Sequence, residues 1–204
     1  MGQQQYGAMM HGLINHSFQQ YMCDSYGKDA WLEVAARAGV SPPTFEPMLT
    51  YEDAITPAVL DAMALLLRRS RGEVMEDIGA YLVSHPNTEA VRRLLRFGGM
   101  NFEDFLHSLD DLPDRARMAV ADLHLPAIEL YGHDGGRYSL ICDSPTPGFG
   151  HLMMGILRVM ADDYGALALL ELENSAHGRE IVQIQLIQSD FTDGRAFDLG
   201  GRSA

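Results

Sequence analysis

Positively charged residues are scarce in this chain of 204 residues. Lysine and arginine together number 15, against 28 aspartates and glutamates, so the formal net charge at pH 7 is -13. A surface that binds nucleic acid or anionic lipid must neutralise phosphates with basic side chains. The charge balance therefore argues against nucleic acid and anionic membranes as partners, and it favours a basic docking face on any protein partner.

Cysteines and long apolar runs are also few. The two cysteines, Cys23 and Cys142, cannot form a disulfide framework, and the residues after Met1 lack the basic start and apolar stretch of a signal peptide. Charged residues interrupt the apolar stretches well before the roughly 18 residues that a membrane span needs. We therefore expect a cytoplasmic protein with reduced thiols and no membrane insertion.

The common catalytic motifs are missing as well. The sequence contains no phosphate-binding glycine loop, no H-E-x-x-H, no C-x-x-C and no G-x-S-x-G. The acidic pairs at 110–111 and 162–163 stand near predicted helix ends, where capping or solvated carboxylates are common. Cys142 adjoins Asp143, whose negative charge should raise the thiol pKa, so we do not expect a nucleophile there. The sequence thus predicts no enzymatic activity.

The first half of the chain has the apolar period of helices. Apolar residues recur at spacings of three and four over 10–26, and the pattern repeats over 29–38. Thr56 followed by Pro57 pairs a capping residue with the residue favoured at the first helical position, so a third helix should begin there. Further helices are predicted over 73–84, 87–97 and 101–112.

The second half changes to the period of strands. Polar and apolar residues alternate most clearly over 180–188, where Val182 and Ile184 share one face and Ile181 and Gln183 share the other. The predicted elements are strands over 128–131 and 137–142 joined by a turn at 133–136, a helix over 148–164, and strands over 166–173 and 180–188.

The predicted architecture is α+β. A helical part over 10–100 is followed by an α/β part over 101–188 with the order β-β-α-β-β, which implies a four-stranded antiparallel sheet with a helix packed on it. The two parts form a single domain over 10–188. Residues 1–9 and 189–204 are expected to be flexible ends.

Histidine is the most suggestive residue type in the sequence. The chain has eight histidines, but no two stand three or four residues apart, the spacing at which one helix presents both to a metal ion. His151 stands out because it lies on the predicted helix beside an apolar stripe that includes Met153 and Ile156. It is either a half-exposed histidine at the edge of that stripe or a polar group directed into an apolar pocket, as in ligand sites.

A series of short motifs runs through most of the chain. They are Met10-His11-Gly12-Leu13-Ile14-Asn15, Tyr26-Gly27-Lys28-Asp29-Ala30-Trp31, Ala38-Gly39, Asp104-Phe105-Leu106, Leu109-Asp110-Asp111-Leu112, Leu123, Pro126, Gly148 and Gly155-Ile156-Leu157. In order and spacing they resemble the heme nitric oxide/oxygen binding (H-NOX) domains, the sensor modules of soluble guanylate cyclases and bacterial signalling proteins. The resemblance covers about residues 10–188.

The resemblance implies a fold with heme b between the two parts and a gas as ligand. It also implies a conformational signal to a separate effector, such as a histidine kinase or a nucleotide cyclase, because the chain carries no effector domain of its own. The family's proximal iron ligand is a histidine directly after the segment 109–112, where this chain has Pro113. The family's Y-x-S-x-R motif, which holds the heme propionates, falls on Cys142, Ser144 and Thr146, so only the serine matches.

His151 falls where members of the family place a distal-pocket residue. Because a neutral imidazole can bind iron as well as donate a hydrogen bond, His151 is the candidate axial ligand. The resemblance implies that the same pocket receives Ile14 and Phe18 from the first helix and Met154 from the helix of His151.

Two other histidines lie near Pro113 in the sequence. On one continuous helix, His107 would point away from Pro113, and His124 would lie about 16 Å further along. Neither is expected to be a simple substitute for the missing iron ligand.

Two hypotheses of function stay open, and both predict a conformational readout. A divergent H-NOX sensor that still binds heme, with His151 or no protein residue as axial ligand, is favoured by the family motifs and by the retained Ser144 and Pro126. A heme-free module that binds another apolar small molecule or only a protein partner is favoured by Pro113, Cys142 and Thr146, which replace the three strongest family residues. A third hypothesis, a small hydrolase that uses Cys142 or His151, has the least support.

Overall fold

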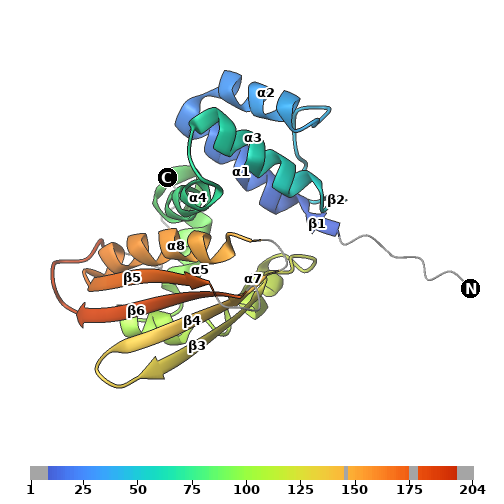
Figure 1. The fold of residues 1–204 in the computed structure, drawn as a ribbon. Coiled ribbons are helices and arrows are strands. Elements are labelled where there is room, and N and C mark those ends of the chain that lie inside the picture. The colour runs from blue at the N-terminus through green and yellow to red at the C-terminus, as the bar shows by residue number, and fades with distance from the viewer. Residues whose placement is uncertain (1–8, 145–146, 175–178, 197–204) are drawn as a thin grey trace, which may run out of the picture. The chain divides into compact units, whose positions relative to one another are not determined.

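A computed structural model of the chain describes residues 9–144, 147–174 and 179–196. The chain divides into two compact units, one ending at Val74 and the other beginning at Met75 (Figure 1). The sequence placed this boundary after residue 100. The difference arises because Val83 and Leu95 pack into the hydrophobic core that the sheet also lines. None of the helices in the described ranges is both long and apolar enough to cross a membrane.

The first unit is helical apart from one short pair of strands. The antiparallel strands are β1 (Met9–His11) and β2 (Thr50–Glu52), and the helices are α1 (Gly12–Tyr26), α2 (Lys28–Arg37), α3 (Ile55–Leu67) and the first turn of α4 (Arg71–Ser84). The ends of α1, α2 and α4 lie within two residues of the predicted ranges. Apolar side chains buried in this unit include Phe18, Tyr21, Met22, Trp31, Val34, Phe45, Val59, Leu60 and Met63.

Helix α1 starts two residues later than the apolar period suggests, because Met9–His11 pairs with β2. Its first residue, Gly12, lies against the loop that precedes β2. The Gly12 amide donates a 2.7 Å hydrogen bond to the carbonyl oxygen of Leu49, and a Cβ at Gly12 would lie 2.2 Å from the carbonyl oxygen of Glu46. Only glycine fits this close approach.

Helix α3 starts two residues earlier than the capping pattern of Thr56 and Pro57 suggests. It begins at Ile55, so Thr56 is not its capping residue. Thr56 is buried instead, and its hydroxyl donates a 2.8 Å hydrogen bond to the Asn15 Oδ1 atom of α1. The helix stops at Leu67 because Arg68 adopts the left-handed conformation, with φ 55°.

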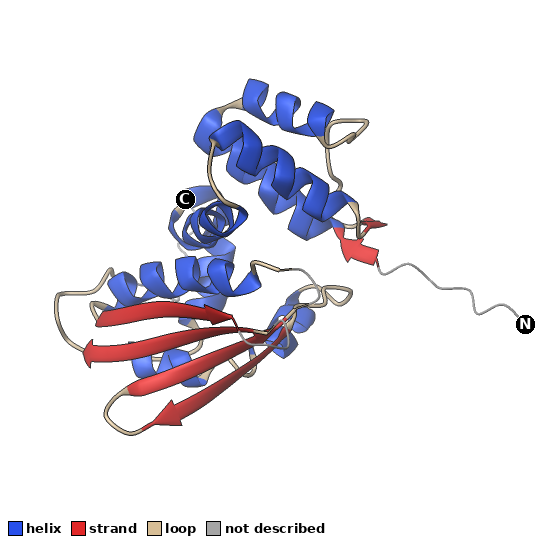
Figure 2. Cartoon of the chain, viewed as in Figure 1, coloured by secondary structure: helices blue, strands red, loops and turns tan. Residues whose placement is uncertain are grey.

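The second unit contains the sheet. Its elements are α4 from Met75 onward, the 3-10 turn Pro86–Thr88, α5 (Glu89–Arg96), α6 (Phe102–His107), α7 (Leu112–Ala119), β3 (Ala127–His133), β4 (Arg137–Asp143), α8 (Phe149–Tyr164), β5 (Leu167–Asn174) and β6 (Glu180–Gln188). The strands form one antiparallel sheet in the order β3-β4-β6-β5 (Figure 2). The predicted α+β class and β-β-α-β-β order are confirmed.

The single helix predicted over 101–112 is two helices in the structure. The Asn101 side chain caps α6 by accepting a 2.8 Å hydrogen bond from the Asp104 amide, and α6 ends at His107. Helix α7 then begins at Leu112 with Pro113 in its first turn. Proline has no amide hydrogen and cannot continue a helix, but its fixed φ suits the first turn of a new one.

One face of the sheet carries the core of the second unit. Along β4, the side chains of Tyr138, Leu140 and Cys142 are buried and alternate with more exposed ones, and Val182 and Ile184 of β6 are buried on the same face, as the two-residue period predicts. Helix α8 runs along β5 and β6 (Figure 1) and belongs to the same core.

Two glycines let α8 pack directly on the backbone of α4. A Cβ at Gly79 would lie 2.1 Å from the carbonyl oxygen of Leu152, and a Cβ at Gly155 would lie 2.0 Å from the carbonyl oxygen of Glu76. A larger side chain at either position would push the two helices apart. This contact explains why both helices carry a glycine in mid-helix, where glycine is otherwise unfavourable.

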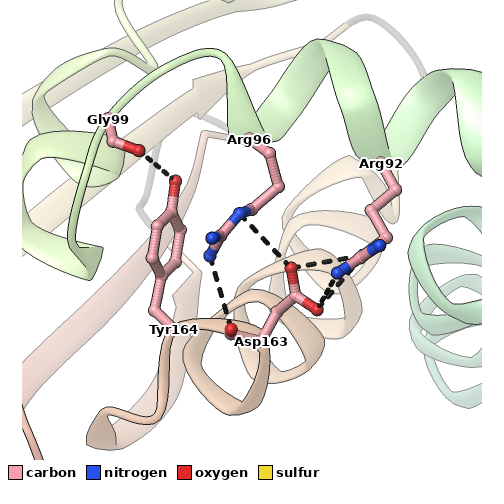
Figure 3. A network of polar contacts seen from close by, with 5 residues as sticks. All are labelled: Arg92, Arg96, Gly99, Asp163 and Tyr164. Atoms are coloured by element: carbon pink, nitrogen blue, oxygen red, sulfur yellow. Dashed lines mark hydrogen bonds and ion pairs between the residues drawn. The ribbon is translucent and has the colours of Figure 1, made fainter. Parts of the chain in front are cut away.

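A buried ion pair joins α5 to the end of α8 (Figure 3). The Arg92 Nη2 atom lies 2.7 Å from Asp163 Oδ1, with side chains 9% and 2% exposed, and the Arg96 Nε atom lies 3.6 Å from Asp163 Oδ2. The Arg96 guanidinium also lies 4.0 Å from the centre of the Tyr164 ring, and the Tyr164 hydroxyl donates to the Gly99 carbonyl. The expectation that Asp163 is a solvated or capping charge was wrong, because two arginines of α5 reach it.

Part of the predicted flexible tail is hydrogen-bonded to the end of α8. The amides of Phe191 and Thr192 donate to the carbonyl oxygen of Gly165 at 2.8 and 3.0 Å, and the Arg195 amide donates to the carbonyl oxygen of Asp163 at 2.9 Å. Residues 197–204 lie outside the described ranges.

The substitution Asp163→Asn should lower the free energy of unfolding by about 3–5 kcal/mol, because it leaves two largely buried guanidinium groups without their counter-charge. Urea unfolding measures the loss. The matched control is Glu89→Gln, which removes the exposed pair between Glu89 and Arg93 on α5 and should cost less than about 0.5 kcal/mol. Equal losses in the two variants would contradict the importance of the buried pair.

Candidate functional site

Pro113 stands at the position where the resemblance puts the iron ligand. It is half-buried in the first turn of α7, between Leu112, which is buried in the core, and Asp114, whose charge suits the positive end of a helix. Proline is well suited to this place in a helix, but its side chain has no atom that can bind a metal ion. The residue therefore serves the start of α7 and supplies no axial ligand.

A pocket of about 310 Å³ lies beside Pro113, between α7 and β3. Its polar lining residues are Asp110, Asp114, Arg117, His124 and Glu129. Some of these groups already have partners, since Asp110 accepts a hydrogen bond from the Leu130 amide and Arg117 pairs with Asp114. Pockets for apolar ligands are usually lined by apolar and aromatic side chains, so this charged lining does not suit a porphyrin ring.

The two histidines considered as substitutes for the iron ligand are both exposed. His107 lies on α6 with its ring edge-on to Tyr138, at 5.8 Å between ring centres. His124 is closer to Pro113 than the sequence suggests, because α7 ends at Ala119 and the chain turns back, so that both residues line the same pocket. The separation of about 16 Å applies to one continuous helix, and that condition does not hold because α7 ends at Ala119.

Cys142 stands where the resemblance puts the family's tyrosine. It is 1% exposed on β4 and faces Glu180 across the β4–β6 pair. Burial raises the pKa of the Cys142 thiol to about 12, and the charge of Glu180 adds to the effect. Asp143, which the sequence suggested as the cause, instead forms an exposed pair with Arg179. A buried, protonated thiol is a poor nucleophile and only a weak hydrogen-bond donor.

The carboxylate of Glu180 caps the N-terminus of α8. Its two oxygens accept hydrogen bonds from the amides of Gly148, at 2.9 Å, and Gly150, at 2.8 Å, and the residue is 8% exposed. Amides at a helix N-terminus favour an anion. Glu180 was not predicted from the sequence. The signal was its place in phase with the buried Val182 and Ile184, because a charged residue on a buried face needs a polar partner.

His151 and Met154 lie one helical turn apart on α8. His151 is half-buried and, among the described residues, has no hydrogen-bond partner, while Met154 is 6% exposed. Ile14 and Phe18 lie one turn apart on α1, where Ile14 is half-buried and Phe18 is 4% exposed. Because α1 and α8 belong to different units, the meeting of these four side chains in one pocket stays a prediction.

The other positions of the anchoring motif lie at the ends of strands. Ser144 is half-buried directly after β4, and Pro126 is half-buried directly before β3. Thr146, at the position of the family's arginine, lies outside the described residues.

The residues at these positions do not fit heme in the way the family holds it. Pro113 has no donor atom, Cys142 keeps its proton, and the carboxylate of Glu180, opposite Cys142, already binds the amides of Gly148 and Gly150. A second carboxylate from a heme propionate would meet a negative charge there. Within the described ranges, no three His, Cys, Asp or Glu side chains are grouped as metal ligands.

Comparison with known proteins identifies the family. A family model described as Haem-NO-binding matches residues 11–171, which is well over half of the chain. The chain therefore belongs to the Haem-NO-binding (H-NOX) family, whose domains are heme-based gas-sensor modules of guanylate cyclases and bacterial sensors.

Two curated relatives are soluble guanylate cyclases. Soluble guanylate cyclase gcy-34 of Caenorhabditis elegans is 26% identical over 156 residues, which cover 74% of this chain and 23% of the cyclase. Soluble guanylate cyclase 89Da of Drosophila melanogaster is 22% identical over 187 residues, which cover 90% of this chain and 28% of the cyclase. The chain thus spans about a quarter of the length of these relatives.

Solved H-NOX structures share the fold. The unliganded Fe(II) H-NOX protein from K. algicida has a TM-score of 0.75 and 15% identity, and covers 88% of this chain and 98% of its own. The H-NOX protein from S. oneidensis in the Fe(II)NO state has a TM-score of 0.73 and 16% identity, and covers 87% of this chain and 99% of its own.

The high thiol pKa predicts an alkaline loss of stability from Cys142. Above about pH 9 the thiol of the unfolded chain ionises, whereas the folded thiol keeps its proton up to about pH 12. The stabilising contribution is therefore complete below pH 9 and is lost as the pH rises. Between pH 9 and 11, wild type should lose about 1.4 kcal/mol per pH unit relative to Cys142→Ala in urea unfolding. Equal pH dependence of the two proteins would show that the folded thiol also ionises.

Proposed function

We propose that this chain is a sensory domain of the H-NOX family that works without the family's iron–histidine bond. It is a heme-free regulatory module that binds another apolar small molecule or a protein partner. Its output is a change of conformation, which a separate effector such as a histidine kinase or a nucleotide cyclase reads. The net charge of -13 favours a basic docking face on that effector.

The observation that carries this proposal is Pro113 in the first turn of α7. An axial ligand must offer a nitrogen, sulfur or oxygen donor to iron, and the proline ring offers none. The state of Cys142 and the bonds of Glu180 support the same conclusion for the propionate end of the heme.

A second candidate is a sensor that holds heme through His151. It is favoured by one observation, the half-buried position of His151 on α8 with no hydrogen-bond partner among the described residues. A neutral imidazole in that state has a nitrogen free to bind iron. The two candidates differ in their response to added heme.

Titration of the purified chain with hemin separates them. We expect no saturable change in the Soret band at one heme per chain, and the same spectra for wild type and His151→Ala. The matched control is His107→Ala, which changes an exposed histidine on α6. Binding of one heme per chain, with a Soret position that changes in His151→Ala and persists in His107→Ala, would overturn the heme-free proposal and establish the second candidate.

A further inference from the structure

Helix α7 is attached to the rest of the second unit by few groups. Of its residues Leu112–Ala119, only Leu112 and Ala116 are buried, and the side chains of Asp114, Arg117 and Met118 are exposed. A helix of two turns depends on tertiary packing for its stability, and here only two apolar side chains provide that packing. Of the two half-buried residues, Pro113 and Arg115, only Arg115 has a polar side chain, and its contacts supply the additional attachment.

The Arg115 guanidinium reaches two neighbouring helices at once. Its Nη1 atom donates to the carbonyl oxygen of Leu94, in the last turn of α5, at 3.3 Å. Its Nη2 atom donates to the carbonyl oxygen of Ser108, which caps the end of α6, at 2.9 Å, and to the Ser108 hydroxyl at 3.2 Å. Carbonyls in the last turn of a helix have no partner within it and carry its partial negative charge. The Arg115 guanidinium therefore donates hydrogen bonds to the C-terminal ends of both α5 and α6.

The ends of α5 and α6 are in close contact at this point. A Cβ at Gly98 would lie 2.1 Å from the Ser108 hydroxyl, and that hydroxyl donates to the carbonyl oxygen of Phe105 at 2.7 Å. The acceptors of Arg115 are thus held in place by neighbouring contacts. Burial lowers the pKa of the Arg115 guanidinium, while the charge of Asp111 acts in the opposite direction.

We propose that Arg115 is the positioning residue that holds α7 on the ends of α5 and α6, and that α7 loosens as a unit when this contact is lost. The inference rests on the proposed function, because Pro113, where the family's iron tether is missing, lies in the first turn of α7. A side chain of the helix itself supplies a tether in its place. The ion pairs of Arg92 and Arg96 with Asp163 then connect α5 to α8.

Hydrogen exchange of the full chain, followed by mass spectrometry, tests the tether without heme. In Arg115→Ala we expect peptides that cover 112–119 to exchange roughly ten to a hundred times faster, because charged hydrogen bonds are lost, while β4 and β6 keep their protection. Arg117→Ala is the matched control on the same helix, since it removes only an exposed pair with Asp114. Its α7 peptides should stay within about twofold of wild type.

Arg115→Lys is the second variant, for the case that Arg115→Ala does not fold. Lysine keeps the charge but cannot span both acceptors, so α7 should exchange faster than in wild type by a smaller factor than in Arg115→Ala. Unchanged exchange of peptides over 112–119 in both Arg115→Ala and Arg115→Lys would overturn the proposal. So would an equal acceleration of α7, β4 and β6, which would assign Arg115 a general structural role. The hemin titration is independent of either result.

Discussion

The carboxylate of Glu180 at the start of α8 is the contact on which much of the second unit depends. It fixes the first turn of α8 to β6 by accepting hydrogen bonds from two main-chain amides. The close approach requires glycine at 150, where a Cβ would lie 2.8 Å from the Glu180 Cβ. It also places a negative charge opposite Cys142 and so helps to keep that thiol protonated. A structural contact thereby helps to set the protonation of the thiol at the position where the resemblance puts the family's tyrosine.

Charged side chains fix both ends of helix α8, and a close backbone contact fixes its middle. Glu180 binds its first amides, Arg92 and Arg96 of α5 bind Asp163 at its last turn, and Gly155 lets the backbone of α4 approach. Apolar packing on the sheet fills the space between these contacts. The helix that carries His151 is therefore a rigid element of the second unit, whereas α7 has fewer anchors.

The fold could be predicted from the sequence because its elements have strong periods. Alternation over β6 and the three- and four-residue spacing over α1 and α8 each follow from one buried face. The break between α6 and α7 was missed because the apolar spacing continues through Leu109 and Leu112, while the effect of Pro113 on the helix depends on where the preceding helix stops.

The candidate site could be predicted only in part. Pro113 and Cys142 were assigned from the family order of motifs, and their roles stay predictions. The partners of Glu180 and Asp163 were missed because they are distant in the sequence. Only the fold brings Gly148 to Glu180 and Arg92 to Asp163. The direction of the Cys142 pKa was predicted correctly, but from Asp143, which the strand turns to the other face.

The mass of the intact, natively folded chain tests the central claim most directly. Protein is produced in cells supplied with heme and is measured in a volatile buffer that preserves bound cofactors. The account predicts the mass of the polypeptide without heme. A mass that includes one heme per chain, retained in the native spectrum and released on denaturation, would contradict it.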